Sequence, residues 1–416
     1  MRVALSSYRS KPHSGGQGVY VRNLSRELVA LGHRVQVFSG PPYPELDPGV
    51  GLTRVPSLDL YRHDDRFHHP AWSELRSRVD VLEYLTMCGS GFPEPRTFGI
   101  RLEQLLRDRI GDFDILHDNQ TLAPGILRLE KRGLPLLTTI HHPISRDRRL
   151  ELDAARGWQR LTKRRWYGFV AMQARVARDS NHLLTVSQNS AVDIERDFKV
   201  APERMSVVPV GVDVTTYRPP MQSRISGRIV TIASADVPLK GLDVLIRALT
   251  AMDPGAWSEL HVVGHASDRT NKALAQAGLL DRVRFERGLS DTELAQLIGS
   301  AEVHAVPSLY EGFSLPAVEA MACATPIVAS RVGALPELVA ADAGVLVPSG
   351  DAAALGRALT EVLAAPERRA AMGEAGRERA VSTYSWRAVA EATTRVYEQV
   401  IAAGHPSLPS AKENAP

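Results

Sequence analysis

Short apolar runs alternate with longer amphipathic segments along most of the chain. An apolar run at 3–5 is followed by a segment of helical periodicity at about 16–31 and by a second apolar run at 34–38. The later runs of the first half lie at 113–117, 134–140, 182–186 and 206–210, with a helical pattern at 122–131 between the first two. Repeated strand–helix–strand patterning predicts a parallel, doubly wound sheet.

A second series of the same kind begins at 228–233, after a polar, proline-bearing link at 217–227. Its further strand candidates are 261–263, 283–285, 303–306 and 326–329, and its helical candidates include 242–251, 292–298 and 315–322. Residues 40–100 show no clear periodicity, so we expect long loops with short strands there.

The length of 416 residues favours two domains, because one ordinary core does not grow to that size. The pattern places the first domain at 1–215 and the second at 216–385. A last helix is predicted at about 386–403. The tail 404–416 lacks the apolar residues that folding requires and is expected to be disordered.

Composition narrows the class of protein. A hydrophobic fraction of 44% and a charged fraction of 23% are typical of a soluble globular protein, and a net charge of +3 gives no argument for nucleic-acid binding. The two cysteines, Cys88 and Cys323, lie far apart and outside any metal-ligand spacing, which suits a reducing cytoplasm. The first apolar run is too short for a signal peptide, and no run approaches the ~18 residues of a membrane span.

A glycine-rich turn, Ser14-Gly15-Gly16-Gln17-Gly18, joins the first predicted strand to the first predicted helix. Glycines there let the backbone approach a ligand, and the helix start offers unpaired N–H groups to an anion. The spacing departs from the dinucleotide fingerprint. Two interpretations stay open at this point, a phosphate-binding loop and a plain tight turn.

Two acids stand in an otherwise apolar segment at 308–330. Pro316 fits the first turn of a helix that runs through Glu319, so the N–H groups of the preceding loop would face a ligand. Glu319 has a simpler explanation, since acids in the first turns of a helix offset its dipole. Glu311 has none. Carboxylates accept hydrogen bonds from vicinal hydroxyls, so the pair around an amide-lined loop suits a phosphorylated sugar.

The segment Glu311-Gly-Phe-Ser-Leu-Pro-Ala-Val-Glu319 resembles the Glu-seven-residues-Glu signature of the family-4 retaining glycosyltransferases. Four further stretches and the last helix resemble that family in the expected order: Gly15-Gly16, Thr139-Ile-His141, Val208-Pro-Val-Gly-Val-Asp213, Pro238-Leu-Lys240-Gly-Leu-Asp243 and Tyr384-Ser-Trp386. The resemblance covers nearly the whole chain.

This resemblance implies two facing Rossmann-like domains with a cleft between them, and a C-terminal helix that crosses back to the N-terminal domain. It implies that Glu319 binds the ribose, that Glu311 binds the transferred sugar, and that Lys240 neutralises the diphosphate. His141 would lie near the sugar and the acceptor. The donor would further meet the glycine turn and the amides of the loop at Gly15, Gly16, Gly312, Phe313, Ser314 and Leu315. No metal or other cofactor is expected, and no Asp-x-Asp pair occurs.

One departure from the family concerns the end of the first strand of the second domain. Ser234 stands where the family carries an arginine that also binds the diphosphate. Either Lys240 acts alone, or another arginine substitutes, or donor affinity is low.

A basic segment at 146–178 interleaves ten lysines and arginines with Trp158, Trp166 and Tyr167. One interpretation is the solvated face of a long surface helix. The other is a docking face for an anionic acceptor or for an anionic membrane surface.

The resemblance therefore implies a metal-independent, retaining hexosyltransferase. It would move a hexose from a UDP- or GDP-linked donor to a hydroxyl acceptor, in the cytoplasm or at the inner face of the membrane. The alternatives are a non-catalytic nucleotide-sugar binder, for which Ser234 is the argument, and a sugar-nucleotide epimerase of the same architecture. A phosphorylase would need a pyridoxal-phosphate lysine context, which we do not find.

Overall fold

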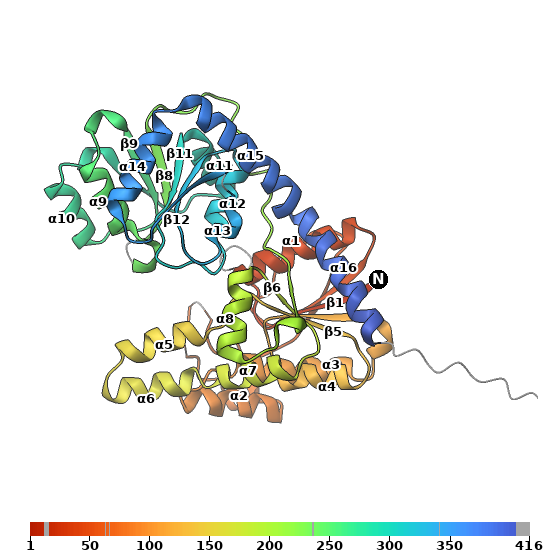
Figure 1. Cartoon of the computed structure of the whole chain (residues 1–416). Helices are drawn as coiled ribbons and strands as arrows, with labels where there is room; N and C mark the ends of the chain where they lie inside the picture. Colours follow the sequence, from red (N-terminus) through yellow and green to blue (C-terminus); the bar gives the residue numbers. More distant parts are fainter. Residues whose placement is uncertain (12–15, 63, 66, 235–236, 341, 405–416) are drawn as a thin grey trace, which may run out of the picture. The chain divides into compact units, whose positions relative to one another are not determined.

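The computed structural model describes residues 1–416 apart from 12–15, 63, 66, 235–236, 341 and 405–416. The chain divides into two compact units (Figure 1). Unit 1 comprises Met1–Val186, Ser190–Val208 and the segment from Val389 onward, and unit 2 comprises Ser187–Asn189 and Pro209–Ala388.

Unit 1 is built on a parallel sheet with the strand order β3-β2-β1-β4-β5-β6-β7 among the described residues. Its strands are β1 (Arg2–Ser7), β2 (Arg34–Ser39), β3 (Gly51–Arg54), β4 (Ile115–Asn119), β5 (Leu136–Ile140), β6 (Leu183–Thr185) and β7 (Met205–Val207). The order reverses between β1 and β4. In open α/β sheets, ligands bind beyond the carboxyl ends of the strands at such a point.

The helices of unit 1 include one from the far end of the chain. They are α1 (Gly16–Ala30), α2 (Arg78–Cys88), α3 (Glu94–Leu106), α4 (Pro124–Lys131), α5 (Ser145–Ala154), α6 (Gly157–Trp166), α7 (Phe169–Asp179), α8 (Gln188–Phe198) and most of α16 (Trp386–Gly404). The short 3-10 helices are η1 (Trp72–Glu74), η2 (Ile110–Asp112) and η3 (Pro202–Arg204). The packing of α16 on unit 1 agrees with the predicted return of the last helix.

Unit 2 has a parallel sheet with the order β10-β9-β8-β11-β12-β13 in the described part of the chain. Its strands are β8 (Arg228–Ile232), β9 (Glu259–Val263), β10 (Val283–Glu286), β11 (Val303–Val306), β12 (Ile327–Ser330) and β13 (Gly344–Val347). Its helices are α9 (Leu242–Ala251), α10 (Asp268–Gln276), α11 (Asp291–Ser300), α12 (Leu315–Ala322), α13 (Leu335–Leu338), α14 (Ala352–Leu363), α15 (Pro366–Tyr384), η4 (Pro238–Lys240), η5 (Pro254–Ala256) and η6 (Leu280–Arg282).

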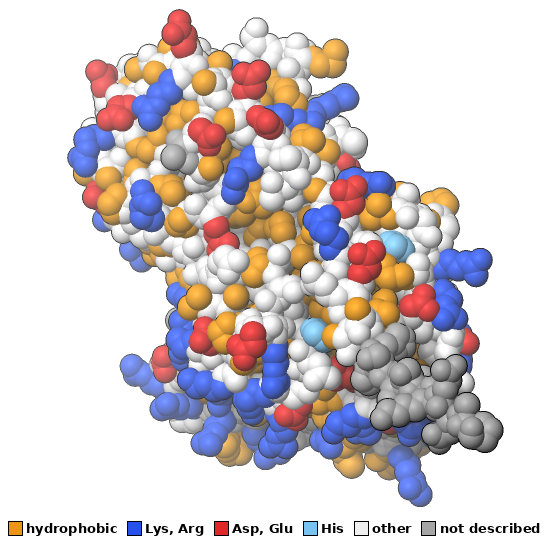
Figure 2. Space-filling model, turned by 45° about the vertical axis from the view of Figure 1, so that its right-hand side comes forward, with side chains coloured by type: hydrophobic (Ala, Val, Ile, Leu, Met, Phe, Trp, Pro, Cys, Tyr) orange, Lys and Arg blue, Asp and Glu red, His pale blue; other side chains and the backbone are white. Residues whose placement is uncertain are grey.

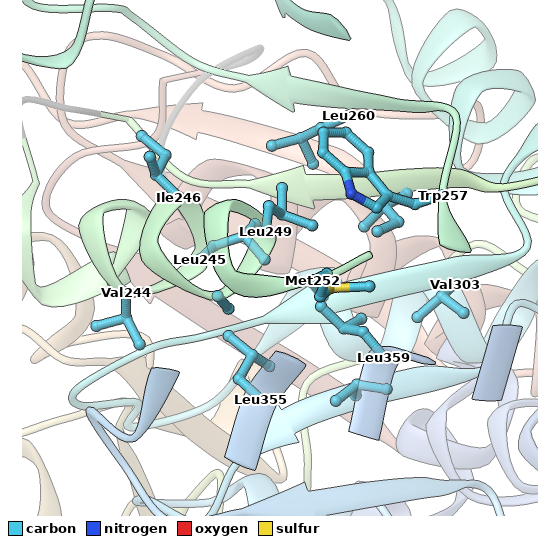
Figure 3. Packing of buried hydrophobic residues seen from close by; sticks show 14 of the residues in the cluster. Val244, Leu245, Ile246, Leu249, Met252, Trp257, Leu260, Val303, Leu355 and Leu359 are labelled. Atoms are coloured by element: carbon cyan, nitrogen blue, oxygen red, sulfur yellow. The ribbon is translucent and has the colours of Figure 1, made fainter. Parts of the chain in front are cut away.

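Both faces of the unit 2 sheet are covered by apolar side chains. Ile229 and Val230 are neighbours on β8, and each belongs to a different buried cluster. Successive residues of a strand point to opposite faces. One cluster, around Leu245, Leu249 and Leu359, is shown in Figure 3. The pattern of a strand buried on both faces is that of a doubly wound α/β fold.

The prediction of long loops and short strands over residues 40–100 holds for the described residues up to 77 and is wrong from residue 78 onward, where two helices form. The segment contains α2, the start of α3 and β3. The two helices bury charged residues, namely Glu83, Glu94 and Arg101, where an amphipathic pattern would place apolar ones. Arg101 forms an ion pair with Glu83 at 2.5 Å. Because these buried positions carry charges, the sequence lacks the apolar periodicity from which an amphipathic helix is predicted. The capping box of Ser77 and Asp80 was a usable signal for the start of α2.

Candidate active site

The predicted donor residues of unit 2 gather where β11 runs into α12. Glu311 lies in the connecting loop with only 5% of its surface exposed. Lys240 Nζ lies 2.7 Å from its Oε1 atom, and Ser308 Oγ donates to the same oxygen at 2.8 Å. Residues 71 positions apart therefore form an ion pair. An ammonium has three donors, so Lys240 keeps donors for phosphate oxygens while it holds Glu311.

Two glycines in the left-handed backbone region allow this approach. Gly241, with φ +71°, follows Lys240, and a Cβ atom there would lie 1.9 Å from the carbonyl oxygen of Pro307. Gly333, with φ +55°, brings a second chain segment against the loop, and its Cβ would lie 1.7 Å from the carbonyl oxygen of Glu311. Any other residue at either position would push the Lys240 or Glu311 backbone away.

The start of α12 follows the loop directly. Ser314 is the N-cap residue, Leu315 begins the helix and Pro316 occupies its first turn, as the sequence predicts. Ser314 is fully buried, and its Oγ has no hydrogen-bond partner among the described residues. The loop from Gly312 through Phe313 leads into this helix start, where backbone N–H groups favour an anion.

Glu319 lies within α12, and its environment differs from that of Glu311. The pKa of Glu319 is raised to about 7, mainly by desolvation and to a smaller extent by the nearby Asp291 carboxylate. The hydroxyl of Tyr217 bonds to the Glu319 side chain and acts in the opposite direction. The two acids of the signature thus differ in their partners: a lysine and a serine for Glu311, a tyrosine for Glu319.

Ser234 occupies the end of β8, where the family arginine is expected. Its Oγ accepts a hydrogen bond from the backbone N–H of His265 at 3.1 Å. Gly264, with φ +154°, passes so close that a Cβ atom would lie 2.8 Å from the Cα of Ser234. The serine therefore joins the end of β8 to the loop after β9.

His141 directly follows β5 in unit 1. Its Nε2 lies 2.8 Å from Asn119 Oδ1, and its backbone N–H donates to Gln120 Oε1 at 2.8 Å. Gln120 Nε2 also donates to the carbonyl of His142 at 3.0 Å. The Tyr20 ring stands edge-on to the imidazole, with centroids 4.8 Å apart. The histidine is therefore held through both its ring and its backbone.

The protonation of His141 follows from its surroundings. Desolvation lowers the pKa of His141 to about 3, so the ring is neutral at physiological pH. Because the Asn119 oxygen can only accept, the ring proton resides on Nε2 and Nδ1 keeps a lone pair. Such a ring accepts a hydrogen bond from a hydroxyl but is a weak general base. His142 is exposed and lies 3.5 Å from Asp147.

Of the predicted glycine turn, Gly15 lies outside the described residues, and Gly16 is the first residue of α1. The sequence did not reveal Asn119, Gln120, Tyr20, Tyr217 or Ser308 as parts of the site. A signal existed for two of them, because Asp118-Asn119-Gln120-Thr121 is a polar run at the end of a buried strand.

The basic segment 146–178 is not one long helix but covers α5, α6 and α7. Several of its cations are engaged within the protein: Arg149 with Asp197, Lys163 with Glu151, Arg165 with the carbonyl of Gly89, and Arg178 with the carbonyl of Phe198. Trp166 packs on Tyr61 and Phe92. Trp158, by contrast, is 76% exposed, and Figure 2 shows basic side chains gathered along the lower edge of the molecule.

Among the described residues, no helix has the length and apolar content that crossing a membrane requires. Nor do three His, Cys, Asp or Glu side chains of the described part of the chain form a group that could hold a metal ion.

Comparison with known proteins gives matches along nearly the whole chain. Residues 14–216 match the family described as Glycosyltransferase Family 4, and residues 215–379 match Glycosyl transferases group 1. A relative from Mycolicibacterium hassiacum named MMP alpha-(1->4)-mannosyltransferase is 54% identical over 407 residues, which cover 97% of this chain and 99% of the relative. A D-inositol 3-phosphate glycosyltransferase 2 from Catenulispora acidiphila is 31% identical, with 96% and 95% covered.

Solved structures agree on the fold. Sucrose-phosphate synthase from Thermosynechococcus elongatus aligns with a TM-score of 0.69 at 23% identity and covers 97% of this chain and 99% of its own. The structure of Anabaena Alr3699/HepE in complex with UDP aligns with a TM-score of 0.67 at 16% identity, with 96% and 100% covered. With two parallel α/β units and these matches, the chain belongs to the family-4 glycosyltransferases and is a glycosyltransferase of the GT-B fold.

Proposed function

We propose that this protein is an α-(1→4)-mannosyltransferase that moves mannose from a nucleoside-diphosphate mannose to the 4-hydroxyl of a sugar acceptor. The sugar and linkage are taken from the relative that is 54% identical over nearly the whole of both chains. The observation that carries the chemistry is the Glu311–Lys240 ion pair at 2.7 Å, placed beside the start of α12.

Different residues bind different parts of the donor. Lys240 and the backbone amides of Gly312–Leu315 bind the diphosphate. The Glu311 carboxylate, which Lys240 and Ser308 orient, accepts hydrogen bonds from hydroxyls of the mannose. The Glu319 carboxylate accepts hydrogen bonds from the ribose hydroxyls. The positive charge of Lys240 and the helix N-terminus stabilise the leaving diphosphate without a metal ion.

His141 belongs to the acceptor side of the reaction. Its neutral ring offers Nδ1 as an acceptor for a sugar hydroxyl, and Asn119 and Gln120 fix its direction. Since its pKa is lowered, the ring is not the main base. An α-linked product formed from an α-linked donor retains the anomeric configuration, which fits attack from the side of the departing phosphate.

The decisive experiment is a transfer assay with mannose and glucose donors of UDP, GDP and ADP, a mannoside acceptor with a free 4-hydroxyl, and NMR of the product. We expect transfer from a mannose donor of one base, an α-(1→4) linkage, and activity that survives EDTA. Lys240→Gln, which keeps most of the side-chain volume, serves as the matched inactive variant. A β-linkage, a transferred glucose only, or activity lost to EDTA and restored by Mg²⁺ would contradict the proposal.

We also propose that α6 docks on an anionic surface at the inner face of the membrane. Every residue of this helix keeps solvent exposure, and Trp158 and Leu161 are 76% and 46% exposed beside Arg160 and Arg164. Exposed aromatic and basic side chains on one helix suit the headgroup region of anionic lipids.

A further inference from the structure

Two side-chain pairs, one of which includes His141, link β4 to β5 and the residue that follows β5. His117 and Asn119 are alternate residues of β4, so they point to the same face of the sheet. Thr139 lies on β5 and pairs in register with Asn119, and His141 follows two residues later. His117 Nε2 lies 2.6 Å from Thr139 Oγ1, as Asn119 Oδ1 lies 2.8 Å from His141 Nε2. We call the His117–Thr139 pair the inner rung and the Asn119–His141 pair the outer rung.

The inner rung is closed by the C-terminal helix α16. Tyr397 Oη lies 2.6 Å from His117 Nδ1, and Tyr397, His117 and Thr139 are all fully buried. A neutral imidazole has one donor and one acceptor, and each of its partners here is a hydroxyl that can fill either role. Both nitrogens of His117 are therefore satisfied, and only as long as Tyr397 keeps its hydroxyl.

Tyr20 of α1 links the inner rung to the outer one. Its ring stands edge-on to His117, with centroids 6.4 Å apart, and to His141, with centroids 4.8 Å apart. A displacement of His117, or of Thr139 through its hydrogen bond to His117, is therefore transmitted to the Tyr20 ring and from there to the His141 ring.

We propose that Tyr397 is a positioning residue for His141, acting through His117, Thr139 and Tyr20. Besides packing on unit 1, α16 then supplies one hydroxyl, that of Tyr397, which fixes the orientation of the candidate catalytic histidine. The consequence for catalysis rests on the proposed function of His141, whereas the consequence for the His141 ring does not.

The matched pair of variants is Tyr397→Phe and Thr394→Val. Thr394 Oγ1 lies 3.1 Å from His33 Nε2, so it also joins α16 to a histidine of unit 1 through a hydroxyl, but outside the chain of contacts to His141. Each substitution removes one hydroxyl–histidine hydrogen bond from the same helix. A purely structural role would let each variant lower the unfolding midpoint but would leave the His141 ring signals unchanged in both.

The measurements are the ¹⁵N and ¹H signals of the His141 ring, the kcat and donor KM, and the unfolding midpoint. We expect Tyr397→Phe to shift the His141 ring signals and to lower kcat by about 3- to 10-fold with donor KM unchanged, as for the loss of one buried hydrogen bond. Thr394→Val should lower only the unfolding midpoint. As a second test, Thr139→Ser should keep the wild-type signals and Thr139→Val should not.

Unshifted His141 signals in Tyr397→Phe, or an equal shift in Thr394→Val, would overturn the inference. Failure of the proposed function is a separate result, because it would show as full activity in His141→Ala. In that case the ring signals of Tyr397→Phe still decide whether Tyr397 positions the histidine.

Discussion

Nucleotide affinity should depend on the protonation of Glu319. Desolvation raises the pKa of this carboxyl to about 7, and only its ionised form accepts hydrogen bonds from both ribose hydroxyls. The ionised fraction rises from about one-eleventh at about pH 6 to about ten-elevenths at about pH 8. Affinity should therefore increase about tenfold over this range, which corresponds to about 1.4 kcal/mol.

The assay is isothermal titration with the nucleotide sugar, whose diphosphate diester does not titrate in this range. Glu319→Gln should bind more weakly and lose the pH dependence. Asp291→Asn is the informative partner, because removing the nearby charge should lower the pKa of Glu319 and move the rise in affinity to lower pH. An affinity that does not change between these pH values, or a slope that persists in Glu319→Gln, would refute the reasoning.

Three further predictions concern other parts of the chain. Ser234→Arg should tighten donor binding by about 1.5–3 kcal/mol if its guanidinium meets the diphosphate; unchanged titration would show that another residue occupies that position. His304 is fully buried with neither ring nitrogen bonded among the described residues, and burial lowers its pKa to about 4. The free energy of unfolding should therefore be independent of His304 ionisation above about pH 6.5 and fall by about 1.4 kcal/mol per pH unit between about pH 6.5 and about pH 4. Urea unfolding of His304→Leu should lack this loss. Replacing Trp158, Arg160 and Arg164 together by Ser should reduce sedimentation with anionic liposomes, and unchanged sedimentation would contradict docking through α6.

The sequence predicted the elements whose signals are local. The bounds expected for α12 and β11, 315–322 and 303–306, are those observed, because a proline at the helix start and an uninterrupted buried run mark them directly. The two helices between 78 and 106 were missed, since paired charges replace apolar residues at their buried positions.

For the candidate site, the sequence suggested individual residues but not the contacts between them. Glu311 and Lys240 could be named separately, yet their contact depends on Gly241 and Gly333, which let separate loops approach each other closely. The support of His141 by Gln120 was equally hidden. Gln120 adopts φ +56°, a conformation that non-glycine residues rarely take and that no sequence pattern announces.

The central claim is that the two acids of the signature perform different tasks, and it is tested by titrating Glu311→Ala and Glu319→Ala with the nucleoside diphosphate beside steady-state kinetics. If Glu311 meets the sugar as charge develops on it, Glu311→Ala should lose about 30- to 1000-fold in kcat and bind the nucleoside diphosphate normally. Glu319→Ala should mainly weaken nucleotide binding and raise donor KM. Equal losses of nucleotide affinity in both variants, or full activity in Glu311→Ala, would contradict the account.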